Sequence, residues 1–472
     1  MKIHLILAAG EADPLRKQDP FMPLALPILA SNAPEHEYVF TDLLWEDSDK
    51  IDYDADFDLI GISFRVSATD KAFEIADKFR ENGKKVVLGG AQASSIPLKT
   101  KQHADSVVIG EGELLWPILI SDLQKGELKD FYVSSPKSDI DFEGYSVYRL
   151  SSLPQLTNLP LPERKMFDRK YTFDMVFAAR GCPVNCSFCA VSDIFGTAMR
   201  FKDHSMVIDE INSFGRRFFL IDDTVFGMNN CYDYYLELYR KIQQLPKKRF
   251  WIGQANLDAA ANSKGRDVIT QASLAGLSYV SIGLETINPQ NMKDTGIIPK
   301  MGITDKENPL AEIKKNIEFI QGQGIGISGW FTIGLEHDTM ESCRQSIDFC
   351  IETNIFPVFT PIQALEGTRY YSELKEKSLL LDQKSNVSNV RNASLENHDY
   401  ITILKEVIDK AYSRNQIWKR TWFYLKTIHK TKKGLFNLIH RIILLHITQL
   451  KLKKISKQEL IRFKSRIKND DV

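Results

Sequence analysis

Short apolar runs alternate with helical patterns along the first 125 residues of the chain. The strand candidates are apolar throughout, and helical stretches separate them. Such strands predict a parallel sheet that helices cover on both faces. The predicted strands are residues 3–8, 39–43, 58–63, 85–90 and 106–110, and the predicted helices are 21–33, 69–82 and 113–123.

The same alternation resumes at about residue 171, after a polar and proline-rich stretch. Six strand and helix units predict an incomplete β/α barrel, a fold in which the chemistry lies at the C-terminal ends of the strands. From about residue 395 the pattern is helical and basic. The predicted strands are residues 173–178, 218–221, 250–254, 279–284, 326–333 and 356–361, and the helices between them include 205–214, 232–244, 310–323 and 340–353.

These patterns predict an α/β chain with four successive regions. The 472 residues exceed the size at which a single hydrophobic core stops growing, so we expect at least two domains. The regions are a doubly wound, Rossmann-like (flavodoxin-like) domain at 1–135, a linker at 136–170, a partial (β/α)6 barrel of the TIM type at 171–380 and a basic α-helical region at 381–472.

The net charge of zero conceals an asymmetry, because the chain joins an acidic body to a basic tail. Residues 401–472 hold eighteen Lys and Arg residues and five Asp and Glu residues. This tail contains aromatic and cationic residues at 418–424 and an apolar stretch at 435–450. Two interpretations stay open: peripheral contact with an anionic membrane surface, and a helix packed on the barrel with a solvated cationic face.

Cysteine content and hydropathy indicate the cellular compartment. Six cysteines are too few for a disulfide scaffold, which favours a reducing environment. The apolar run near the N-terminus is short and acidic residues follow it, so a buried first strand is a better interpretation than a signal peptide. No run approaches the length of a membrane span. We therefore expect a cytoplasmic protein, with peripheral contact at the inner membrane surface as the option that the tail raises.

The strongest motif is a run of three cysteines, Cys182, Cys186 and Cys189, directly after a predicted strand. Closely spaced thiolates on a short loop bind zinc or an iron–sulfur cluster. A structural zinc site usually has four ligands, and the chain offers no second closely spaced cysteine pair. Three thiolates leave one iron of a cubane cluster open to a further ligand, which predicts a reactive site. The other cysteines, Cys231, Cys343 and Cys350, are expected to be apolar fillers.

With Phe188 before the third cysteine, this loop resembles the radical SAM superfamily. Weaker motifs follow in the family's order at 219–224, 281–285, 329–334 and 361–368, the last with Glu366 where the family usually has Pro. The resemblance covers roughly residues 1–380. It implies a 4Fe–4S cluster on the three cysteines and S-adenosylmethionine held by Phe188, Asp222, Asp223, Gln254, Gly283, Glu285 and Gly334.

The N-terminal region resembles the cobalamin-binding domain of the cobalamin-dependent radical SAM subgroup. The segments that carry this resemblance are 24–29, 58–63, 87–90 and 103–113. The D-x-H-x-x-G sequence that supplies an axial His is absent, and Gln92 stands where many relatives have His. The resemblance therefore implies cobalamin held without a protein His ligand. The residues that it implies for this site are Ser63, Gly89, Gly90, Gly110 and Gly112.

The resemblance implies an enzyme that cleaves S-adenosylmethionine reductively to a 5′-deoxyadenosyl radical and methylates an unactivated carbon of a small-molecule or lipid-like substrate. An electron donor such as flavodoxin or ferredoxin would be its partner. Transfer RNA methylthiotransferases carry extra N-terminal cluster cysteines that this chain lacks, so nucleic acid is not expected. The alternatives are a radical SAM cyclase or rearrangement enzyme without methyl transfer, and a non-catalytic iron–sulfur redox protein with a membrane-binding tail.

Overall fold

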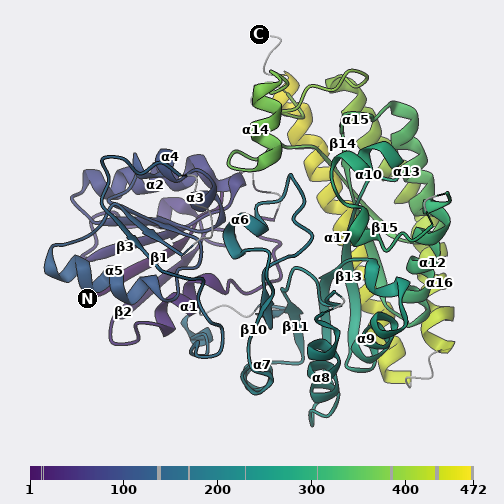
Figure 1. Ribbon diagram of the computed structural model, residues 1–472, viewed down its shortest axis with the longest axis horizontal. Helices are drawn as coiled ribbons and strands as arrows, with labels where there is room; N and C mark the ends of the chain where they lie inside the picture. The colour runs from purple at the N-terminus through teal and green to yellow at the C-terminus, as the bar shows by residue number, and fades with distance from the viewer. Residues whose placement is uncertain are drawn as a thin grey trace. The chain divides into compact units, whose positions relative to one another are not determined.

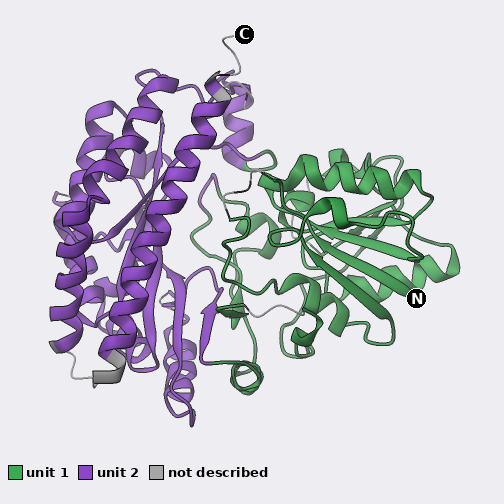
Figure 2. Cartoon of the chain, turned by 180° about the vertical axis from the view of Figure 1, so that it is seen from behind, with its two compact units in different colours: residues 1–185, 189–215, 366–368 green, residues 186–188, 216–365, 369–472 purple. Residues whose placement is uncertain are grey.

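The computed structural model describes residues 1–11, 13, 15–134, 140–167, 171–228, 230–305, 307–382, 386–430 and 435–468. The chain divides into two compact units, shown in green and purple in Figure 2. Unit 1 comprises residues 1–185, 189–215 and 366–368, and unit 2 comprises residues 186–188, 216–365 and 369–472. This division differs from the four regions expected from sequence, whose boundaries stay a prediction; parts of the expected linker, at 136–139 and 168–170, lie outside the described residues.

Unit 1 is built on a parallel sheet of seven strands in the order β2-β1-β3-β4-β5-β6-β7. The order of its first five strands is that of flavodoxin-like folds. The strands are β1 (Lys2–Leu7), β2 (Glu37–Asp42), β3 (Leu59–Ser63), β4 (Val86–Gly89), β5 (Ser106–Ile109), β6 (Phe131–Val133) and β7 (Val147–Arg149).

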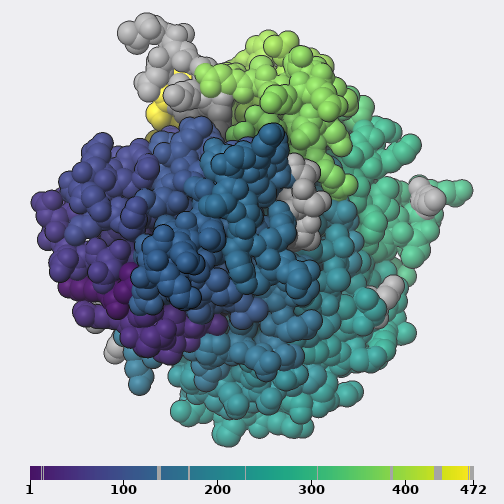
Figure 3. Space-filling model, turned by 60° about the vertical axis from the view of Figure 1, so that its left-hand side comes forward, coloured from purple at the N-terminus to yellow at the C-terminus, as the bar shows by residue number. Residues whose placement is uncertain are grey.

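Helices cover this sheet on both faces, as the apolar strands require. One buried cluster joins the sheet to α2, and the other joins it to α1 and α5. Figure 3 shows side chains of the N-terminal part of unit 1, in purple and blue, on the side that comes forward in this view. The doubly wound prediction is confirmed. The helices of unit 1 are α1 (Ala25–Ser31), α2 (Thr69–Glu81), α3 (Ala91–Ser95), α4 (Pro97–Lys101), α5 (Leu115–Lys125), α6 (Val191–Phe195) and α7 (His204–Ser213).

Part of the stretch expected as linker belongs to this sheet. Strand β7 pairs in parallel with β6 at Phe131↔Val147 and Val133↔Arg149. Both strands are three residues long, and β7 is not fully buried. Backbone pairing at a sheet edge leaves no apolar run in the sequence, which explains why β7 was not predicted.

Unit 2 contains five strands of the predicted barrel, in the order β15-β14-β13-β12-β11, all parallel (Figure 1). The strands are β11 (Arg217–Leu220), β12 (Phe250–Ala255), β13 (Leu277–Glu285), β14 (Gly326–Ile333) and β15 (Phe356–Pro361). The first predicted barrel strand is present as β8 (Asp174–Val176), in unit 1, where two further short strands follow it, β9 (Ala179–Arg180) and β10 (Arg200–Phe201). The barrel prediction is confirmed.

Helices surround the strands of unit 2, and most join consecutive strands. Their burial patterns place the apolar positions of each helix toward the sheet. These helices are α8 (Tyr232–Gln243), α9 (Ser263–Leu274), α10 (Pro289–Asp294), α11 (Ile298–Met301), α12 (Pro309–Gly322), α13 (Met340–Glu352), α14 (Arg369–Glu376), α15 (Asn397–Glu406), α16 (Arg414–Lys430) and α17 (Leu435–Lys468).

The basic C-terminal helices pack against the ends at which the barrel strands begin. The ring of His440 in α17 lies 3.7 Å from the ring of Phe250, the first residue of β12. A Cβ atom on Gly326, the first residue of β14, would lie 2.2 Å from Leu445. Buried Arg441 donates to the carbonyl groups of Ser273 (2.8 Å) and Gly324 (3.0 Å). One face of α17 is therefore part of the core of unit 2.

Helix α16 packs beside α17 through buried polar contacts. The guanidinium group of Arg420 is buried and donates to Gln449 Oε1 (3.0 Å) and to the carbonyl of Ala411 (3.1 Å). The expected helical and basic C-terminal region is confirmed. In the part of the chain that the structure describes, no helix combines the length and apolar character needed to cross a membrane.

The buried His4 side chain makes the stability of unit 1 depend on pH. Burial lowers the pKa of His4 to about 4, and its Nε2 atom pairs with Thr41 Oγ1 at 2.8 Å. A group whose pKa is lowered by folding stabilises the fold above its unfolded pKa, and this stabilisation is lost as the pH falls toward the folded pKa. We predict that the free energy of unfolding falls between pH 6.5 and 4, by at most about 1.4 kcal/mol per pH unit from this one proton.

Urea unfolding of the wild type and His4→Gln, followed by circular dichroism across this pH range, tests the prediction. The variant should show a shallower pH dependence than the wild type. The exposed His398, whose side chain is 73% exposed, supplies the control His398→Gln, which should keep the wild-type slope. Equal slopes for the wild type and His4→Gln would contradict the assignment.

Candidate active site

The three cysteines lie on a tight loop between β9 and α6. Gly181, at the start of this loop, has a φ of +101°, and a Cβ atom there would lie 2.3 Å from the carbonyl oxygen of Ala198. A residue with a side chain would therefore displace the loop. The backbone N–H of Cys182 donates to the carbonyl of Gly196 at 3.2 Å, which ties the loop to the residues that follow α6.

The thiols are the right chemical donors for an iron–sulfur cluster. Cys182, Cys186 and Cys189 form no disulfide, and Cys186 is the most buried of them. Burial raises the pKa of the Cys186 thiol, while the positive charges of Lys300 and Arg369 partly oppose this rise. Among the described residues, no three His, Cys, Asp or Glu side chains are already gathered as a metal cage. Three thiols outside any disulfide, on eight consecutive residues, nevertheless match the ligands that such a cluster takes, and binding would deprotonate them.

Glu285, the last residue of β13, lies in an ion pair beside this loop's Phe188. Lys300 Nζ donates to Glu285 Oε1 at 2.8 Å and lies 6.0 Å from the centre of the Phe188 ring. Thr332 in β14 donates to the second carboxylate oxygen at 2.9 Å. A Cβ atom on Gly283 would lie 2.4 Å from Glu285 Oε1 and 3.0 Å from Lys300 Nζ, so the glycine leaves room for the pair.

The backbone of Glu285 is strained. Its φ is +58°, and the register of β13 against β14 shifts between Gly283 and Glu285. A non-glycine residue in this region costs about 1–3 kcal/mol, and such strain gathers at functional sites. The strain and the buried Lys300 partner support the predicted functional role of Glu285.

The exposed positions of the unit 2 strands share one face near their C-terminal ends. Gln254 in β12 and Trp330 in β14 are exposed, although their neighbours in the chain are buried. Gln254 pairs with Ser281, and Gly283 pairs with Trp330, so these residues point to the same side of the sheet. Polar groups on this face, at this end of the strands, occupy the usual place of a barrel's ligand.

The other residues expected to contact S-adenosylmethionine have structural partners. Asp222 is buried and accepts a hydrogen bond from the hydroxyl of Tyr235 in α8 at 2.8 Å, whereas Asp223 is partly exposed. Gly334 has a φ of +94°, and a Cβ atom there would lie 2.2 Å from the hydroxyl of Tyr400 in α15. Packing on α15 thus explains this glycine, and its contact with a cofactor stays a prediction.

The residues expected to hold cobalamin meet at one edge of the unit 1 sheet. Ser63 and Gly89 end β3 and β4 as direct partners, and Gly110 follows β5. Gly90 has a φ of +96°, and a Cβ atom there would lie 2.8 Å from Ser63 Oγ. A Cβ atom on Gly112 would lie 3.0 Å from a Leu29 methyl group. The edge is the one at which doubly wound sheets bind ligands, and it is lined by small residues as predicted.

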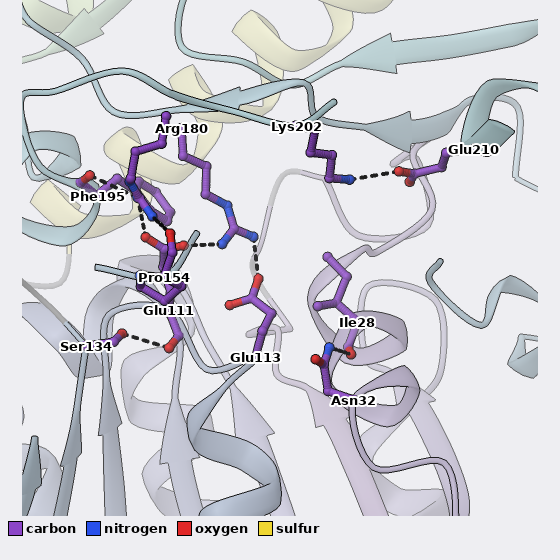
Figure 4. Close-up of polar contacts among 11 residues, drawn as sticks. Ile28, Asn32, Glu111, Glu113, Ser134, Pro154, Arg180, Phe195, Lys202 and Glu210 are labelled. Carbon is purple, nitrogen blue, oxygen red and sulfur yellow. Dashed lines mark hydrogen bonds and ion pairs between the residues drawn. The ribbon is translucent and has the colours of Figure 1, made fainter. Parts of the chain in front are cut away.

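A buried cluster of charges connects this edge to the cysteine loop within unit 1 (Figure 4). Arg180 and Arg200 face each other across the β9–β10 pair, and both bond the carboxylate of Glu111. Arg180 also bonds Glu113, and it lies two residues before Cys182. Both carboxylates belong to the turn that follows β5. The ion pairs therefore fix the first cysteine's strand against the sheet edge that carries Gly110 and Gly112.

Comparison with known proteins decides the class of this site. The model of the radical SAM superfamily matches residues 176–350, which include the cysteine loop and Glu285. Residues 176–350 form a radical SAM domain.

Relatives and solved structures extend the similarity beyond the radical SAM domain. The bacteriochlorophyllide d C-8(2)-methyltransferase of Chlorobaculum tepidum is 28% identical over 90% of this chain and 91% of its own length. A structure of the cobalamin-dependent S-adenosylmethionine radical enzyme OxsB aligns with a TM-score of 0.66 at 13% identity, covering 100% of this chain and 80% of OxsB. The radical S-adenosylmethionine methyltransferase TsrM from Kitasatospora setae aligns with a TM-score of 0.62 at 17% identity, covering 80% of this chain and 76% of TsrM.

The charge cluster of Arg180, Arg200, Glu111 and Glu113 is electrostatically balanced. Burial alone would raise the pKa of Glu113, but the charge of Arg180 outweighs it and holds this pKa below its usual value. The Glu111 backbone is fixed as well, because Ser134 Oγ donates to its carbonyl at 2.7 Å. Arg180 also lies 4.3 Å over the ring of Phe177. Each buried charge therefore has an opposite charge in contact, as burial requires.

Sequence reasoning missed two groups at this site. Lys300 follows Pro299 on short helix α11, and nothing in its local pattern distinguishes it from a surface lysine. The sequence did contain a signal for the charge cluster: Glu111 and Glu113 alternate with glycines after β5, and Arg180 precedes Gly181. Their pairing could not be read from the chain, because 67 residues separate Glu113 from Arg180.

Arg180 and Arg200 supply a matched pair of variants, since both contact Glu111. Arg180→Gln leaves Glu113 buried without its partner, which costs about 3–5 kcal/mol for a buried pair. We predict that this variant retains less iron per chain after anaerobic reconstitution and melts at a lower temperature. Arg200→Gln should melt lower but keep the wild-type iron content.

Iron and acid-labile sulfide assays, with thermal melting of the same samples, check this prediction. Arg180→Lys should recover part of the iron content because it restores the charge. Wild-type iron content in Arg180→Gln would show that the ion pairs do not position the cysteine loop.

Proposed function

We propose that this protein is a cobalamin-dependent radical SAM methyltransferase that acts on an unactivated carbon of a small molecule. The observation that carries the proposal is the three-cysteine loop of the radical SAM domain, joined by buried ion pairs to a glycine-lined, flavodoxin-like sheet edge. A bound 4Fe–4S cluster with S-adenosylmethionine would supply a 5′-deoxyadenosyl radical, and bound cobalamin would supply the transferred methyl group.

Each predicted residue takes a role in this proposal that its position supports. Cys182, Cys186 and Cys189 hold the cluster, and Phe188 shields it from solvent. Glu285, with its charge balanced by Lys300, presents carboxylate oxygens at the C-terminal end of β13, where they orient the polar groups of S-adenosylmethionine.

Further polar contacts to S-adenosylmethionine come from the neighbouring strands. Gln254 supplies an exposed amide on the shared inner face. Asp223 is partly exposed beyond the end of β11, so we favour it over the buried Asp222 for direct contact. Gly283 and Gly334 keep the backbone at the strand ends free of side chains.

The unit 1 edge would hold cobalamin through backbone and small side chains. Ser63, Gly89 and Gly110 leave the ends of β3, β4 and β5 open to a large planar ligand. Gln92, on α3 beside this edge, is partly exposed and carries an amide rather than an imidazole group. Cobalamin bound here would lack a protein His ligand.

The relatives support the proposed substrate class. The Chlorobaculum tepidum relative is named for a chlorophyll-type macrocycle, and a TsrM structure holds tryptophan. Both are small organic molecules with unactivated or aromatic carbons, so we propose a small-molecule substrate for this chain. A flavodoxin or ferredoxin would donate the electron. Contact of the C-terminal helices with a membrane surface is a further proposal, and the side chains that would make it are described in the next subsection.

Removal of a cluster cysteine tests the radical chemistry directly. We predict that anaerobically reconstituted and reduced protein releases 5′-deoxyadenosine from S-adenosylmethionine, and that Cys186→Ala releases none above background. The buried Cys231, outside the loop, gives the control Cys231→Ala, which should retain the activity. Liquid chromatography of the quenched reactions measures the nucleoside. Equal release of 5′-deoxyadenosine by the wild type and Cys186→Ala would contradict the proposal.

Neutralising Glu285 tests its role in binding. Glu285→Gln removes the charge that balances Lys300, so we predict an affinity for S-adenosylmethionine lower by about tenfold, or about 1.4 kcal/mol. The surface carboxylate of Glu352, 63% exposed and paired with Lys314, gives the control Glu352→Gln. Equilibrium binding to the reconstituted proteins measures the affinity. Unchanged affinity in a Glu285→Gln protein with full iron content would remove Glu285 from the site.

A further inference from the structure

The outward faces of α16 and α17 carry a continuous apolar and cationic surface. On α17 the exposed positions recur every three or four residues, so they form one stripe along the helix. Its first half is apolar and its second half is mainly lysine. The stripe consists of Ile439, Ile443, Ile447, Leu450, Lys454, Lys457, Ile461 and Lys464.

Two tryptophans of α16 extend this stripe sideways. Trp418 is 67% exposed and Trp422 is 57% exposed, and they lie one turn apart. The ring of Trp418 lies 5.5 Å from the ring of His446 in α17, and His446 also contacts Thr421 at 3.1 Å. His446 is adjacent in sequence to Ile447 of the stripe. We call these two tryptophans and the α17 stripe the tail surface.

The tail surface is not the face that packs on the barrel. Arg441, Leu445 and Gln449 are fully buried residues of α17 that contact the body of unit 2 or α16. They lie on the opposite side of the helix from Ile443 and Ile447. In Figure 2, which shows unit 2 from behind, the long helix α17 runs in front of the strands. About half or more of the Ile443, Ile447, Trp418 and Trp422 side chains therefore faces away from the core of unit 2.

The charge around the tail surface is almost purely positive. Helices α16 and α17 together hold fourteen Lys and Arg residues and one acidic residue, Glu459. Exposed Lys451, Lys454 and Lys457 continue directly from the apolar half of the stripe. Lys426 Nζ lies 5.4 Å over the ring of Trp422, so a cation also accompanies the aromatic pair.

We infer that the tail surface binds the surface of an anionic lipid bilayer. Half-exposed Ile, Leu and Trp side chains with lysines beside them are the composition of helices that lie in a membrane interface. Tryptophan prefers the headgroup level, and lysine can extend its amine to lipid phosphates while its methylene groups stay among apolar atoms. Each lysine near an anionic membrane adds to the electrostatic attraction.

The charge pattern argues against a second copy of this chain as the occupant. A symmetric dimer would bring the same patch of each chain face to face and would gather the positive charge of both copies in one interface. Nucleic acid would pair with the lysines but would leave the row of isoleucines without an apolar partner. An anionic bilayer offers acyl chains to the apolar half of the stripe and lipid phosphates to its lysine half.

Sedimentation of the full-length protein with vesicles tests this inference. We expect binding to phosphatidylcholine vesicles that contain phosphatidylglycerol, weaker binding to pure phosphatidylcholine, and weakening by salt. The double variant Ile443→Ser/Ile447→Ser should lower vesicle affinity by about tenfold or more, because each exposed isoleucine loses apolar burial. The control Leu98→Ser, at a leucine 40% exposed on α4, should bind as the wild type does.

Two further measurements separate the outcomes. Tryptophan emission should shift to shorter wavelength on vesicle addition, and Trp418→Phe/Trp422→Phe should remove most of the shift. Absence of vesicle binding by the wild type, or equal binding by the wild type and Ile443→Ser/Ile447→Ser, would overturn the inference. It would also be overturned if the isoleucine variant changed the molar mass from light scattering but not vesicle binding, since the surface would then join copies of the chain. The same variants are also assayed for release of 5′-deoxyadenosine from S-adenosylmethionine without vesicles or detergent. This assay reports on the radical chemistry alone, so failure of the membrane inference stays distinct from failure of the proposed function.

Discussion

The buried ion pairs of Arg180 with Glu111 and Glu113 are the constraint on which the site in unit 1 depends. A charge removed from water must be met by an opposite charge in close contact, and here three charged side chains from distant parts of the chain meet that need together. Because Arg180 lies two residues before Cys182, the ion pairs of Arg180 fix the position at which the cysteine loop begins. The same carboxylates fix the turn after β5, so the sheet edge and the loop share one anchor.

In unit 2 the ion pair of Lys300 with Glu285 likewise fixes the position of a predicted site residue. Glu285 occupies a strained backbone conformation at the end of β13, and Lys300 and Thr332 hold its carboxylate there. Strain of this kind persists only where the surroundings determine the conformation. Lys300 lies near both Glu285 and Phe188, so the polar end of β13 and the aromatic residue of the cysteine loop meet at one cation.

Much of the fold could be predicted from the sequence, because its strands are buried on both faces. Strands such as β3 and β14 read as apolar runs ended by small or polar residues, and both were predicted within one residue of their bounds. Strand β7 was missed because it pairs through its backbone at an edge and leaves no pattern. The cysteine loop was also predictable, since its chemistry depends on local spacing alone.

The partners of the site residues were not predictable, since they are set by contacts between distant segments. The sequence around Lys300 does not indicate that its side chain pairs with Glu285. The sequence around Glu111 does not indicate that its carboxylate pairs with the two arginines of the β9–β10 pair. At Gly334 the motif in the sequence predicted a cofactor contact. In the structure, close packing against Tyr400 already explains why this position is a glycine. The sequence of the tail left membrane contact and packing on the barrel open, and the fold assigns a separate face of α17 to packing.

The central claim is that this one chain binds both an iron–sulfur cluster and cobalamin. The most direct test is metal analysis by mass spectrometry of protein produced with iron and cobalamin and purified without oxygen. The account predicts about four iron atoms and about one cobalt atom per chain, with the iron lost and the cobalt retained in Cys182→Ala/Cys186→Ala/Cys189→Ala. A protein that holds its iron but no cobalt would contradict the account, because the glycine-lined edge of unit 1 would then have another purpose.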